Sequence, residues 1–329
     1  MKTRTLGSDP VRISEIGLGC WQIGGDQWGK VSDADAMATL KAAHDSGVTF
    51  FDTADIYGLG RSETLIAKFV KDVKPKDAFI ATKLGRWPTP GLPENCKPEH
   101  VRTFTEESLK RLGVEALDLT QLHCVPLAEL EKGEIFETLR QLKQEGKIKR
   151  FGASVESTAE AKACLAQPGL ASLQIIFNVF RQTPITAIFD EAQKKGVGIV
   201  VRLPLASGLL TGTYSHSTKF APTDHRSYNR NGEKFNVGET FAGLGWENGL
   251  EIVDKLRALM PEGYTMPQLA LRWILDFPAV SAIIPGARNP AQATANAKPS
   301  EMRPISEQTH EKLRRFYQEQ VVPLVRGPD

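Results

Sequence analysis

The hydrophobic positions of the chain follow a recurring pattern in which a helix-like segment ends at a glycine and a short apolar run follows. The pattern occurs at AAHDSG-VTFFDTA, LKRLG-VEALDLTQLH, KQEG-KIKRFGAS, LAQPG-LASLQII and AQKKG-VGIVVR. Glycine tolerates the positive φ that is frequent just after a helix, so we expect these glycines to end helices. Because the runs that follow are mostly apolar rather than strictly alternating, they predict strands buried on both faces, as in a parallel sheet.

Three further apolar runs bring the number of predicted strands to eight, namely IGLGC (16–20), DAFIATK (77–83) and AVSAIIPG (279–286). Most of the strands are separated by helical segments, and Ser32, Pro98 and Pro184 mark plausible helix starts. Eight β/α units in 329 residues favour an α/β protein folded as a closed (β/α)8 TIM barrel, a single domain over residues 1–329. A doubly wound open sheet is the alternative.

Three segments fall outside this repeat. Residues 1–13 hold two short β-prone runs and predict an N-terminal β-hairpin that closes the barrel floor. The segment 204–246, after the seventh strand, is rich in Gly, Ser, Thr and Asn, and a connection this long is typical of a functional loop or lid. Residues 307–320 predict a C-terminal helix on the outside of the barrel.

Composition and charge exclude several classes of partner. The net charge is 41 − 39 = +2 without a basic block, so neither nucleic acid nor an anionic membrane is expected. No stretch approaches 18 apolar residues, and the first residues, MKTRTLGSDPVRIS, contain no signal-peptide core. The four cysteines are dispersed and form no C-x-x-C pair, which is typical of reduced thiols. We therefore expect a cytoplasmic protein.

Titratable side chains recur at the predicted strand ends, which meet at one face of a barrel. Asp52, Lys83 and His123 end three successive strands, and Tyr57 lies five residues beyond Asp52 in FFDTADIYG. A free phenol has a pKa of about 10, and a nearby ammonium lowers it by favouring the phenolate. Lys83 would therefore make Tyr57 more acidic, Asp52 would anchor Lys83, and His123 would orient a carbonyl oxygen. This set suits protonation of an oxygen on which negative charge develops, as carbonyl reduction requires.

The stretches FDTADIYG, ATKLGR, DLTQLH and IPGAR resemble the aldo-keto reductases, and the likeness extends over essentially the whole chain. The resemblance implies a (β/α)8 oxidoreductase that uses a reduced nicotinamide, usually NADPH, and no metal. It further implies that Tyr57 donates the proton with help from Asp52, Lys83 and His123. The predicted activity is the reduction of aldehydes or ketones to alcohols, and the partner is a small carbonyl compound.

A phosphate site is predicted near the end of the eighth strand. The usual dinucleotide fingerprint is missing, because GLGRSE (58–63) lacks a third glycine and follows a loop. In IIPGARNPAQATANA (283–297), Gly286 and Ala287 let the backbone approach a ligand and Pro290 begins a helix. The free N–H groups of that helix start, together with Arg288, predict a site for a phosphate of the cofactor.

The resemblance assigns the remaining cofactor contacts. It places Gln292 and Asn296 with Arg288 at the adenosine 2′-phosphate and adenine, and Ser154 and Gln174 at the nicotinamide carboxamide. The segment LPLASGLL would hold the pyrophosphate through its backbone. Further cofactor contacts are expected from Trp21, Asp52, Arg202, Leu203, Pro204, Leu205, Ser207 and Gly208.

The chain departs from the commonest pattern of this family at three places. Val155 stands where Asn is frequent, and Arg202 stands where many members stack an aromatic ring on the nicotinamide, although a guanidinium also stacks. Gly286 and Gln292 stand where some branches of the family have basic residues. Arg288 is therefore the main positive charge at the predicted phosphate site. NADPH is therefore the expected cofactor, with NADH as the alternative.

The substrate slot is expected to be lined by Trp21, Trp28 and Trp87 beside Tyr57 and His123. The same tryptophans could instead pack against one another beneath the loops. Cys124, directly after His123, is expected to be a bystander that faces the other side of the strand.

Two other classes of protein compete with a reductase. One is a nucleotide-binding regulatory subunit on the same scaffold with little physiological turnover. The other is a metal-dependent barrel hydrolase or isomerase, which the sequence disfavours because its six histidines show no ligand spacing.

Overall fold

Eight parallel strands form one curled sheet in the part of the chain that the computed structural model describes, residues 1–25 and 27–328. Their spatial order equals their order along the chain. The strands are β3 (Leu18–Gly19), β4 (Phe50–Asp52), β5 (Phe79–Leu84), β6 (Leu119–His123), β7 (Phe151–Ser154), β8 (Ser172–Ile176), β9 (Gly198–Arg202) and β10 (Val280–Ile283). Each of them lies within one of the eight predicted runs or overlaps it.

Backbone hydrogen bonds between the two end strands close this sheet into a barrel. The N–H of Gly17 donates to the carbonyl of Ile283 at 2.8 Å, and the N–H of Gly19 donates to the carbonyl of Pro285 at 3.1 Å. The N–H of Ile283 donates in return to the carbonyl of Glu15 at 2.9 Å. The predicted (β/α)8 barrel is confirmed, and the open-sheet alternative is wrong.

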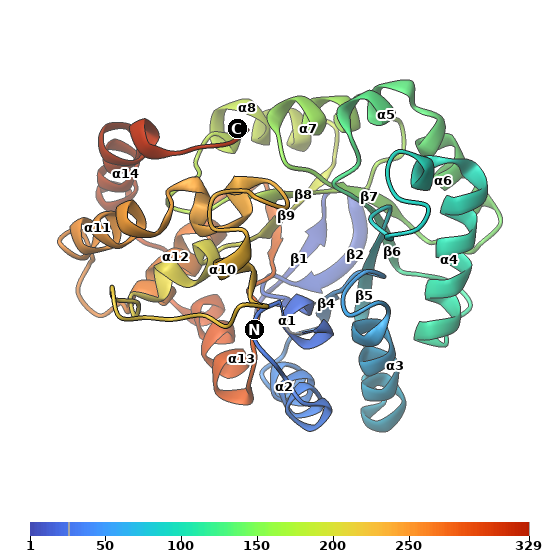
Figure 1. Ribbon diagram of the computed structural model, residues 1–329, viewed down its shortest axis with the longest axis horizontal. Helices are drawn as coiled ribbons and strands as arrows, with labels where there is room; N and C mark the ends of the chain where they lie inside the picture. Colours follow the sequence, from blue (N-terminus) through green and yellow to red (C-terminus); the bar gives the residue numbers. More distant parts are fainter. Residues whose placement is uncertain (26, 329) are drawn as a thin grey trace.

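Helices surround the strands on the outside of the barrel (Figure 1). They are α2 (Asp33–Asp45), α3 (Arg61–Val73), α4 (Pro98–Leu112), α5 (Leu127–Lys132), α6 (Glu134–Gln144), α7 (Thr158–Leu165), α8 (Pro184–Ala187), α9 (Phe189–Lys194), α11 (Trp246–Arg257), α12 (Met266–Leu275), α13 (Pro290–Ala297) and α14 (Glu307–Phe316). Two short helices, α1 (Trp21–Gly24) and α10 (His225–Tyr228), lie in loops instead.

The helix ends follow the predicted local chemistry. Ser32 caps α2 by accepting a hydrogen bond from the N–H of Asp35 at 3.1 Å, and Pro98 occupies the first turn of α4. The glycines of the recurring pattern all have φ between 67° and 86°, which side-chain-bearing residues rarely adopt. They are Gly47, Gly113, Gly146, Gly169 and Gly196.

The N-terminal hairpin closes the barrel floor, as predicted. Strand β1 (Thr3–Leu6) pairs antiparallel with β2 (Asp9–Ser14). Leu6 and Ile13 are fully buried in one hydrophobic cluster with residues inside the barrel, among them Phe50, Phe79 and Val200. The apolar side of the hairpin is thereby removed from water, and this burial holds it in place.

The long connection after β9 contains short helical turns as well as loop. These are η2 (Ala206–Thr211), α10, η3 (Val237–Glu239) and η4 (Phe241–Gly243). Phe241 and Thr240 are fully buried, so the segment carries its own part of the core. It returns across the carboxyl ends of the strands, where it lines the cavity described below.

The predicted C-terminal helix is present but changes its geometry near the end. Helix α14 is α-helical to Phe316 and continues as a π-helical segment, η6 (Tyr317–Val321). Within the described residues, no helix has the length and apolarity required to span a membrane.

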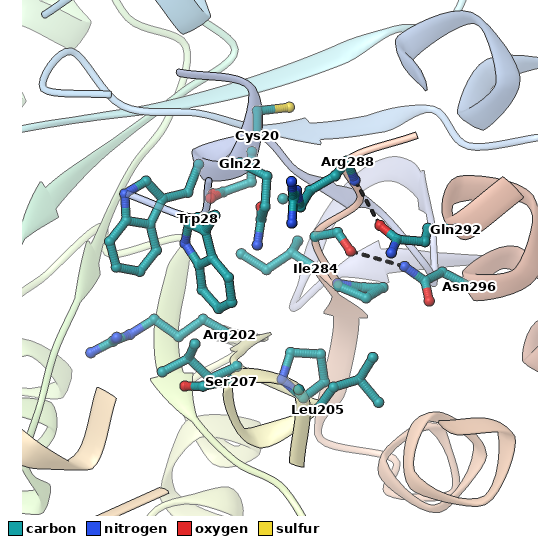
Figure 2. A pocket seen from close by; sticks show the side chains of 18 of the residues that line it. Cys20, Gln22, Trp28, Arg202, Leu205, Ser207, Ile284, Arg288, Gln292 and Asn296 are labelled. Atoms are coloured by element: carbon teal, nitrogen blue, oxygen red, sulfur yellow. Dashed lines mark hydrogen bonds between the residues drawn. The ribbon is translucent and has the colours of Figure 1, made fainter. Parts of the chain in front are cut away.

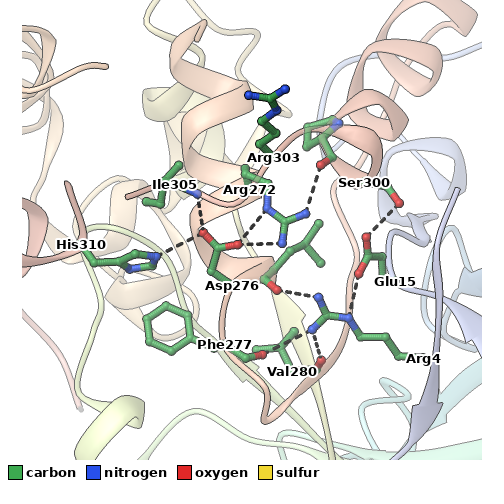
Figure 3. A network of polar contacts seen from close by, with 12 residues as sticks. Arg4, Glu15, Arg272, Asp276, Phe277, Val280, Ser300, Arg303, Ile305 and His310 are labelled. Carbon is green, nitrogen blue, oxygen red and sulfur yellow. Dashed lines mark hydrogen bonds and ion pairs between the residues drawn. The ribbon is translucent and has the colours of Figure 1, made fainter. Parts of the chain in front are cut away.

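A buried polar network joins the hairpin, α12 and the C-terminal segment (Figure 3). Asp276 accepts hydrogen bonds from Arg272, from the N–H of Ile305 at 2.9 Å and from His310 at 3.1 Å, although the donor role of His310 depends on its tautomer. Arg4 of the hairpin pairs with Glu15 at 2.7 Å and donates to the carbonyls of Leu275 and Val280.

Candidate active site

A cavity of about 660 Å³ opens at the carboxyl ends of the strands. Its walls come from the strand ends, from α1 and the loop after it, from the 204–246 segment and from the start of α13. Predicted site residues that line it are Trp21, Trp28, Asp52, Tyr57, His123, Ser154, Gln174, Arg202, Leu203, Pro204, Leu205, Ser207, Gly208, Gly286, Arg288, Gln292 and Asn296. The parallel strands bring these distant residues together because their carboxyl ends share one edge.

Lys83 is buried behind the cavity and connects Asp52 to Tyr57. Its ammonium forms an ion pair with Asp52, donates to the carbonyl of Thr53 at 2.9 Å and donates to the Tyr57 hydroxyl at 3.3 Å. The second carboxylate oxygen of Asp52 accepts from the side-chain amides of Gln121 at 3.0 Å and Gln174 at 2.7 Å. The carboxylate is therefore fully hydrogen-bonded, which lets it hold a buried cation in a fixed position.

The acidity of Tyr57 differs from the expectation. Burial raises its pKa above the ordinary value, and the ammonium of Lys83 offsets this only in part. The prediction that Lys83 lowers the pKa of Tyr57 is thus right for the effect of the lysine and wrong for the net shift. The pKa of Lys83 is raised, because Asp52 and Tyr57 outweigh the opposing effect of burial. The lysine stays charged and the phenol stays protonated at neutral pH.

His123 lies against Tyr57 as a neutral imidazole. The two ring centroids are 5.8 Å apart, with the rings nearly perpendicular. Burial, followed by the charges of Arg86, Lys83 and Arg202, holds the pKa of His123 well below its usual range. Its Nδ1 has no hydrogen-bond partner among the described residues. A neutral ring can donate one hydrogen bond to an oxygen placed in the cavity.

The start of α13 forms the other end of the cavity (Figure 2). The N–H of Arg288 donates to the side chain of Gln292 at 2.8 Å, and Asn296 donates to the carbonyl of Gly286 at 3.1 Å. Asn289 caps the helix by accepting from the N–H of Gln292 at 3.0 Å. Ala287 is buried and is not among the lining residues.

Gly286 makes room for a neighbouring side chain. A Cβ at this position would lie 2.1 Å from the side-chain amide of Gln22, so the glycine makes room for Gln22. Gln22 itself lines the cavity, and its Oε1 is buried without a partner in the described part of the chain. A glutamine after a strand end carries no distinctive sequence signal, so Gln22 was not predicted as a cavity residue.

The turn after β9 has an uncommon backbone. Leu203, Ala206 and Ser207 have φ of 52°, 49° and 55°, although none is glycine. Such conformations cost energy and occur preferentially at functional sites. Ser207 is fixed by its hydroxyl, which donates to the carbonyl of Glu239 at 2.7 Å.

Two of the three predicted substrate tryptophans line the cavity. The rings of Trp21 and Trp28 meet edge to face at 5.4 Å, and Trp21 stacks on Tyr57 at 5.9 Å. Trp87 lies elsewhere: its ring is 6.4 Å from that of Phe104, and the guanidinium of Arg111 covers it at 5.5 Å. The predicted placement of Trp87 at the mouth is therefore wrong, because a residue three positions beyond the end of β5 can turn away from it.

Arg202 is held by the long connection. Its guanidinium forms an ion pair with Glu239 at 2.9 Å and donates to the carbonyl of Val155 at 3.1 Å. It also donates to the sulfur of Cys124 at 3.9 Å. The expectation that Cys124 faces away is therefore wrong: it follows β6 with a φ of 51°, which turns it toward Arg202.

Cys124, Glu156 and Glu239 place three possible metal-ligand atoms within 4.8 Å of one another. Arg202 already supplies a cation to this group, and burial raises the pKa of the Cys124 thiol to about 12, so it is protonated at neutral pH. Burial and the neighbouring Glu239 raise the pKa of Glu156 to about 7. The group is better suited to sharing a proton than to binding a divalent ion.

Cavity residues that were not predicted from the sequence include Gln27, Arg86, Tyr214, Phe235 and Glu239. Most of them lie in loops, whose course follows no periodic pattern in the sequence.

A buried Asp–Lys pair next to a tyrosine and a neutral histidine, at the carboxyl end of a (β/α)8 barrel, defines a barrel protein with an acid–base site. A family model described as the Aldo/keto reductase family matches residues 15–318. The chain belongs to this family.

Known relatives agree in length and fold. The aldo-keto reductase YhdN of Bacillus subtilis is 31% identical over 298 residues, which cover 90% of this chain and 87% of the relative. The NADH-specific methylglyoxal reductase of Escherichia coli is 29% identical and covers 90% of this chain and 92% of its own. The structure of the glycerol dehydrogenase AKR11B4 from Gluconobacter oxydans superposes with a TM-score of 0.79 at 29% identity, covering 97% and 96% of the two chains.

Proposed function

We propose that this protein is an NAD(P)H-dependent oxidoreductase that reduces aldehydes or ketones to alcohols, with Tyr57 as the general acid. The observation that carries the proposal is the hydroxyl of Tyr57, 3.3 Å from the Lys83 ammonium and at the wall of a cavity. As negative charge develops on a carbonyl oxygen, a phenol beside a fixed cation can release its proton.

Each residue of the site has a separate task in this proposal. Tyr57 gives its proton to the carbonyl oxygen, and Lys83 stabilises the phenolate that forms. Asp52 keeps the ammonium of Lys83 in place through their ion pair. His123 donates a hydrogen bond to the same carbonyl oxygen. It remains neutral, so it introduces no additional charge into the site. Trp21 and Trp28 exclude water from one side of the reacting carbonyl.

The cavity fits a nicotinamide dinucleotide in polarity and layout. Buried atoms without partners in the described residues belong to several lining side chains: Gln22 Oε1, Trp28 Nε1, His123 Nδ1 and Arg202 Nε. Ser154 and Gln174 lie at the catalytic end, and Arg288, beside the start of α13, lies at the other. When bound, the reduced nicotinamide supplies the hydride.

The choice between NADPH and NADH depends on the α13 end. Arg288 can pair with a 2′-phosphate, which favours NADPH. The absence of a second basic residue at Gly286 and Gln292, together with a relative that is named NADH-specific, keeps NADH as the alternative.

The test is the substitution Tyr57→Phe, which removes the hydroxyl and keeps the ring that stacks on Trp21. We expect kcat for an aldehyde to fall by about 10³-fold or more, because the general acid is lost, while the Kd of NADPH stays within about threefold. The measurements are steady-state turnover and titration of cofactor fluorescence.

Tyr264→Phe is the matched control, since its hydroxyl binds the carbonyl of Arg303 away from the cavity. A Tyr57→Phe variant with most of the reductase activity would remove Tyr57 from its role. Wild-type protein that binds NADPH and reduces no aldehyde or ketone would favour a regulatory subunit instead.

A further inference from the structure

One guanidinium group at the catalytic end of the cavity lacks a hydrogen-bonded partner. Arg86 follows β5, three residues after Lys83, and lines the cavity together with Tyr57 and His123. Within residues 1–25 and 27–328, its guanidinium makes no hydrogen bond and no ion pair. Phe235 of the long connection lies beside it, with the ring centroid 6.0 Å from the central guanidinium carbon.

The other arginines on the cavity wall differ in this respect. Arg202 is paired with Glu239, and Arg226 is paired with Asp224 at 2.6 Å and donates to the hydroxyl of Tyr214 at 2.7 Å. Arg288 lies at the α13 end, and its guanidinium has no ion pair or hydrogen bond among the described residues; the proposed function assigns it to the cofactor. Among the described residues, Arg86 is therefore the arginine of the cavity wall that has no ion pair at the end where the substrate carbonyl would lie.

The charges around Arg86 leave part of its own charge uncompensated. Lys83 is balanced by Asp52, and Arg202 is balanced by Glu239. Glu156 is the remaining acid in this group, and with its pKa raised to about 7 it is roughly half ionised at neutral pH. Cys124 is protonated there, and His123 is neutral. Arg86 is half-buried, and taking a partly compensated guanidinium out of water is costly unless a ligand completes its hydrogen bonds.

We propose that Arg86 binds an anionic group of the substrate, so that the preferred substrates are aldehydes or ketones that carry a carboxylate or a phosphate. The inference rests on the proposed function and specifies its substrate class. A planar guanidinium matches either anion with two parallel hydrogen bonds. Arg86 then fixes the far end of the substrate while Tyr57 and His123 hold the carbonyl oxygen.

The first experiment compares charged and uncharged aldehydes of similar size. The pairs are succinic semialdehyde with butanal, and glyceraldehyde 3-phosphate with glyceraldehyde, assayed with NADPH. For at least one pair, we expect the kcat/KM of the wild type to be tenfold or more higher for the charged aldehyde. The pair that shows this preference tells whether the site binds a carboxylate or a phosphate. Arg86→Met should abolish that preference, a loss of about tenfold or more, as expected when a charge-assisted pair is removed.

Two further variants control the result. Arg86→Lys keeps the charge without the planar fork and should retain part of the preference. Arg315→Met removes an exposed arginine of α14 and should leave the preference unaltered. Equal kcat/KM within both wild-type pairs, or an unchanged preference in Arg86→Met, would overturn the proposal.

A binding experiment separates this inference from the proposed function. Calorimetric titration of the NADPH-bound protein with butyrate and with butanamide compares an anion with its neutral counterpart. We expect the wild type to bind butyrate at least tenfold more tightly and Arg86→Met to bind the two alike. If no aldehyde is reduced but this selectivity is found, the proposed reductase activity fails and the anion site stands. If butanamide binds as well as butyrate, the anion site fails whatever the turnover.

Discussion

At the scale of single residues, the site depends on one buried ion pair. Lys83 is almost inaccessible to water, and a buried ammonium is stable only when an acid and further hydrogen bonds compensate it. Asp52 and the carbonyl of Thr53 do so. Burial nevertheless raises the pKa of Tyr57. In the proposed mechanism the phenol therefore keeps its proton until charge develops on the substrate oxygen.

Asp55, in the same FDTADIYG stretch, is an unused buried acid. Both of its carboxyl oxygens are buried and have no hydrogen-bond partner among the described residues. Burial and the nearby Glu63 raise its pKa to about 8. The unfolded chain ionises this group above about pH 4, whereas the folded protein keeps it neutral up to about pH 8. Its contribution to stability is therefore complete below about pH 4 and is lost as the pH rises to 8.

We predict that Asp55→Asn removes this pH dependence. Between about pH 5 and 7 the free energy of unfolding of the wild type should fall relative to the variant by about 1.4 kcal/mol per pH unit, the slope for one bound proton. Urea unfolding at several pH values measures this free energy. Asp45→Asn, at an exposed position, is the control. Parallel stability profiles of wild type and Asp55→Asn would contradict the assignment.

At the scale of elements, the hairpin closes the barrel floor, and polar contacts join α12 and β10 to the hairpin and to the C-terminal segment. Arg4 reaches from β1 to the carbonyls around α12 and β10, and Asp276 joins α12 to the C-terminal segment. These contacts connect elements that are far apart in the chain, so they stabilise the closed barrel rather than any one helix.

We predict that Asp276→Asn destabilises the protein by about 3–5 kcal/mol, because it leaves the buried Arg272 without its acid. The measurement is urea unfolding at pH 7. Asp254→Asn is the matched control, since Asp254 makes the same kind of pair with Arg257 on an exposed face and should change stability little. A similar loss of stability in both variants would show that the buried Asp276–Arg272 pair stabilises the protein no more than an exposed pair does.

At the scale of the whole molecule, the long connection is tied to the barrel at the active site. Glu239 of η3 pairs with Arg202 at the end of β9, and both side chains are at least nine-tenths buried. The carbonyl of Glu239 also receives the hydroxyl of Ser207. Glu239 thus ties the long connection to the barrel at Arg202 and to the first turn of the same connection at Ser207.

We predict that Glu239→Gln weakens the attachment of the long connection to the barrel. Loss of the ion pair leaves Arg202 buried without a full counter-charge, so local opening of residues 204–246 becomes easier. Amide hydrogen exchange in that segment should be about tenfold faster or more. Glu247→Gln, which alters an exposed contact with His216, should not change it. Unchanged exchange in Glu239→Gln would show that other contacts hold the segment.

Local signals in the sequence sufficed for the strands, the helix ends and the residues at strand ends. The glycines that end helices and the continuous apolar runs act over a few residues, and parallel pairing then fixes where Asp52, Lys83 and His123 emerge. The sequence failed where position depends on loops. Trp87 turns away from the mouth, Cys124 turns toward Arg202, and Arg86 and Gln22 were missed.

The amino-acid sequence by itself determined the β/α repeat and the chemical character of the strand ends, because hydrophobic periodicity and residue type are local properties. Only the tertiary structure decided which loop side chains complete the cavity, that the pKa of Tyr57 rises, and that Arg86 forms no ion pair with the rest of the described chain. These depend on burial and on charges brought together from distant parts of the chain, and no local pattern encodes either.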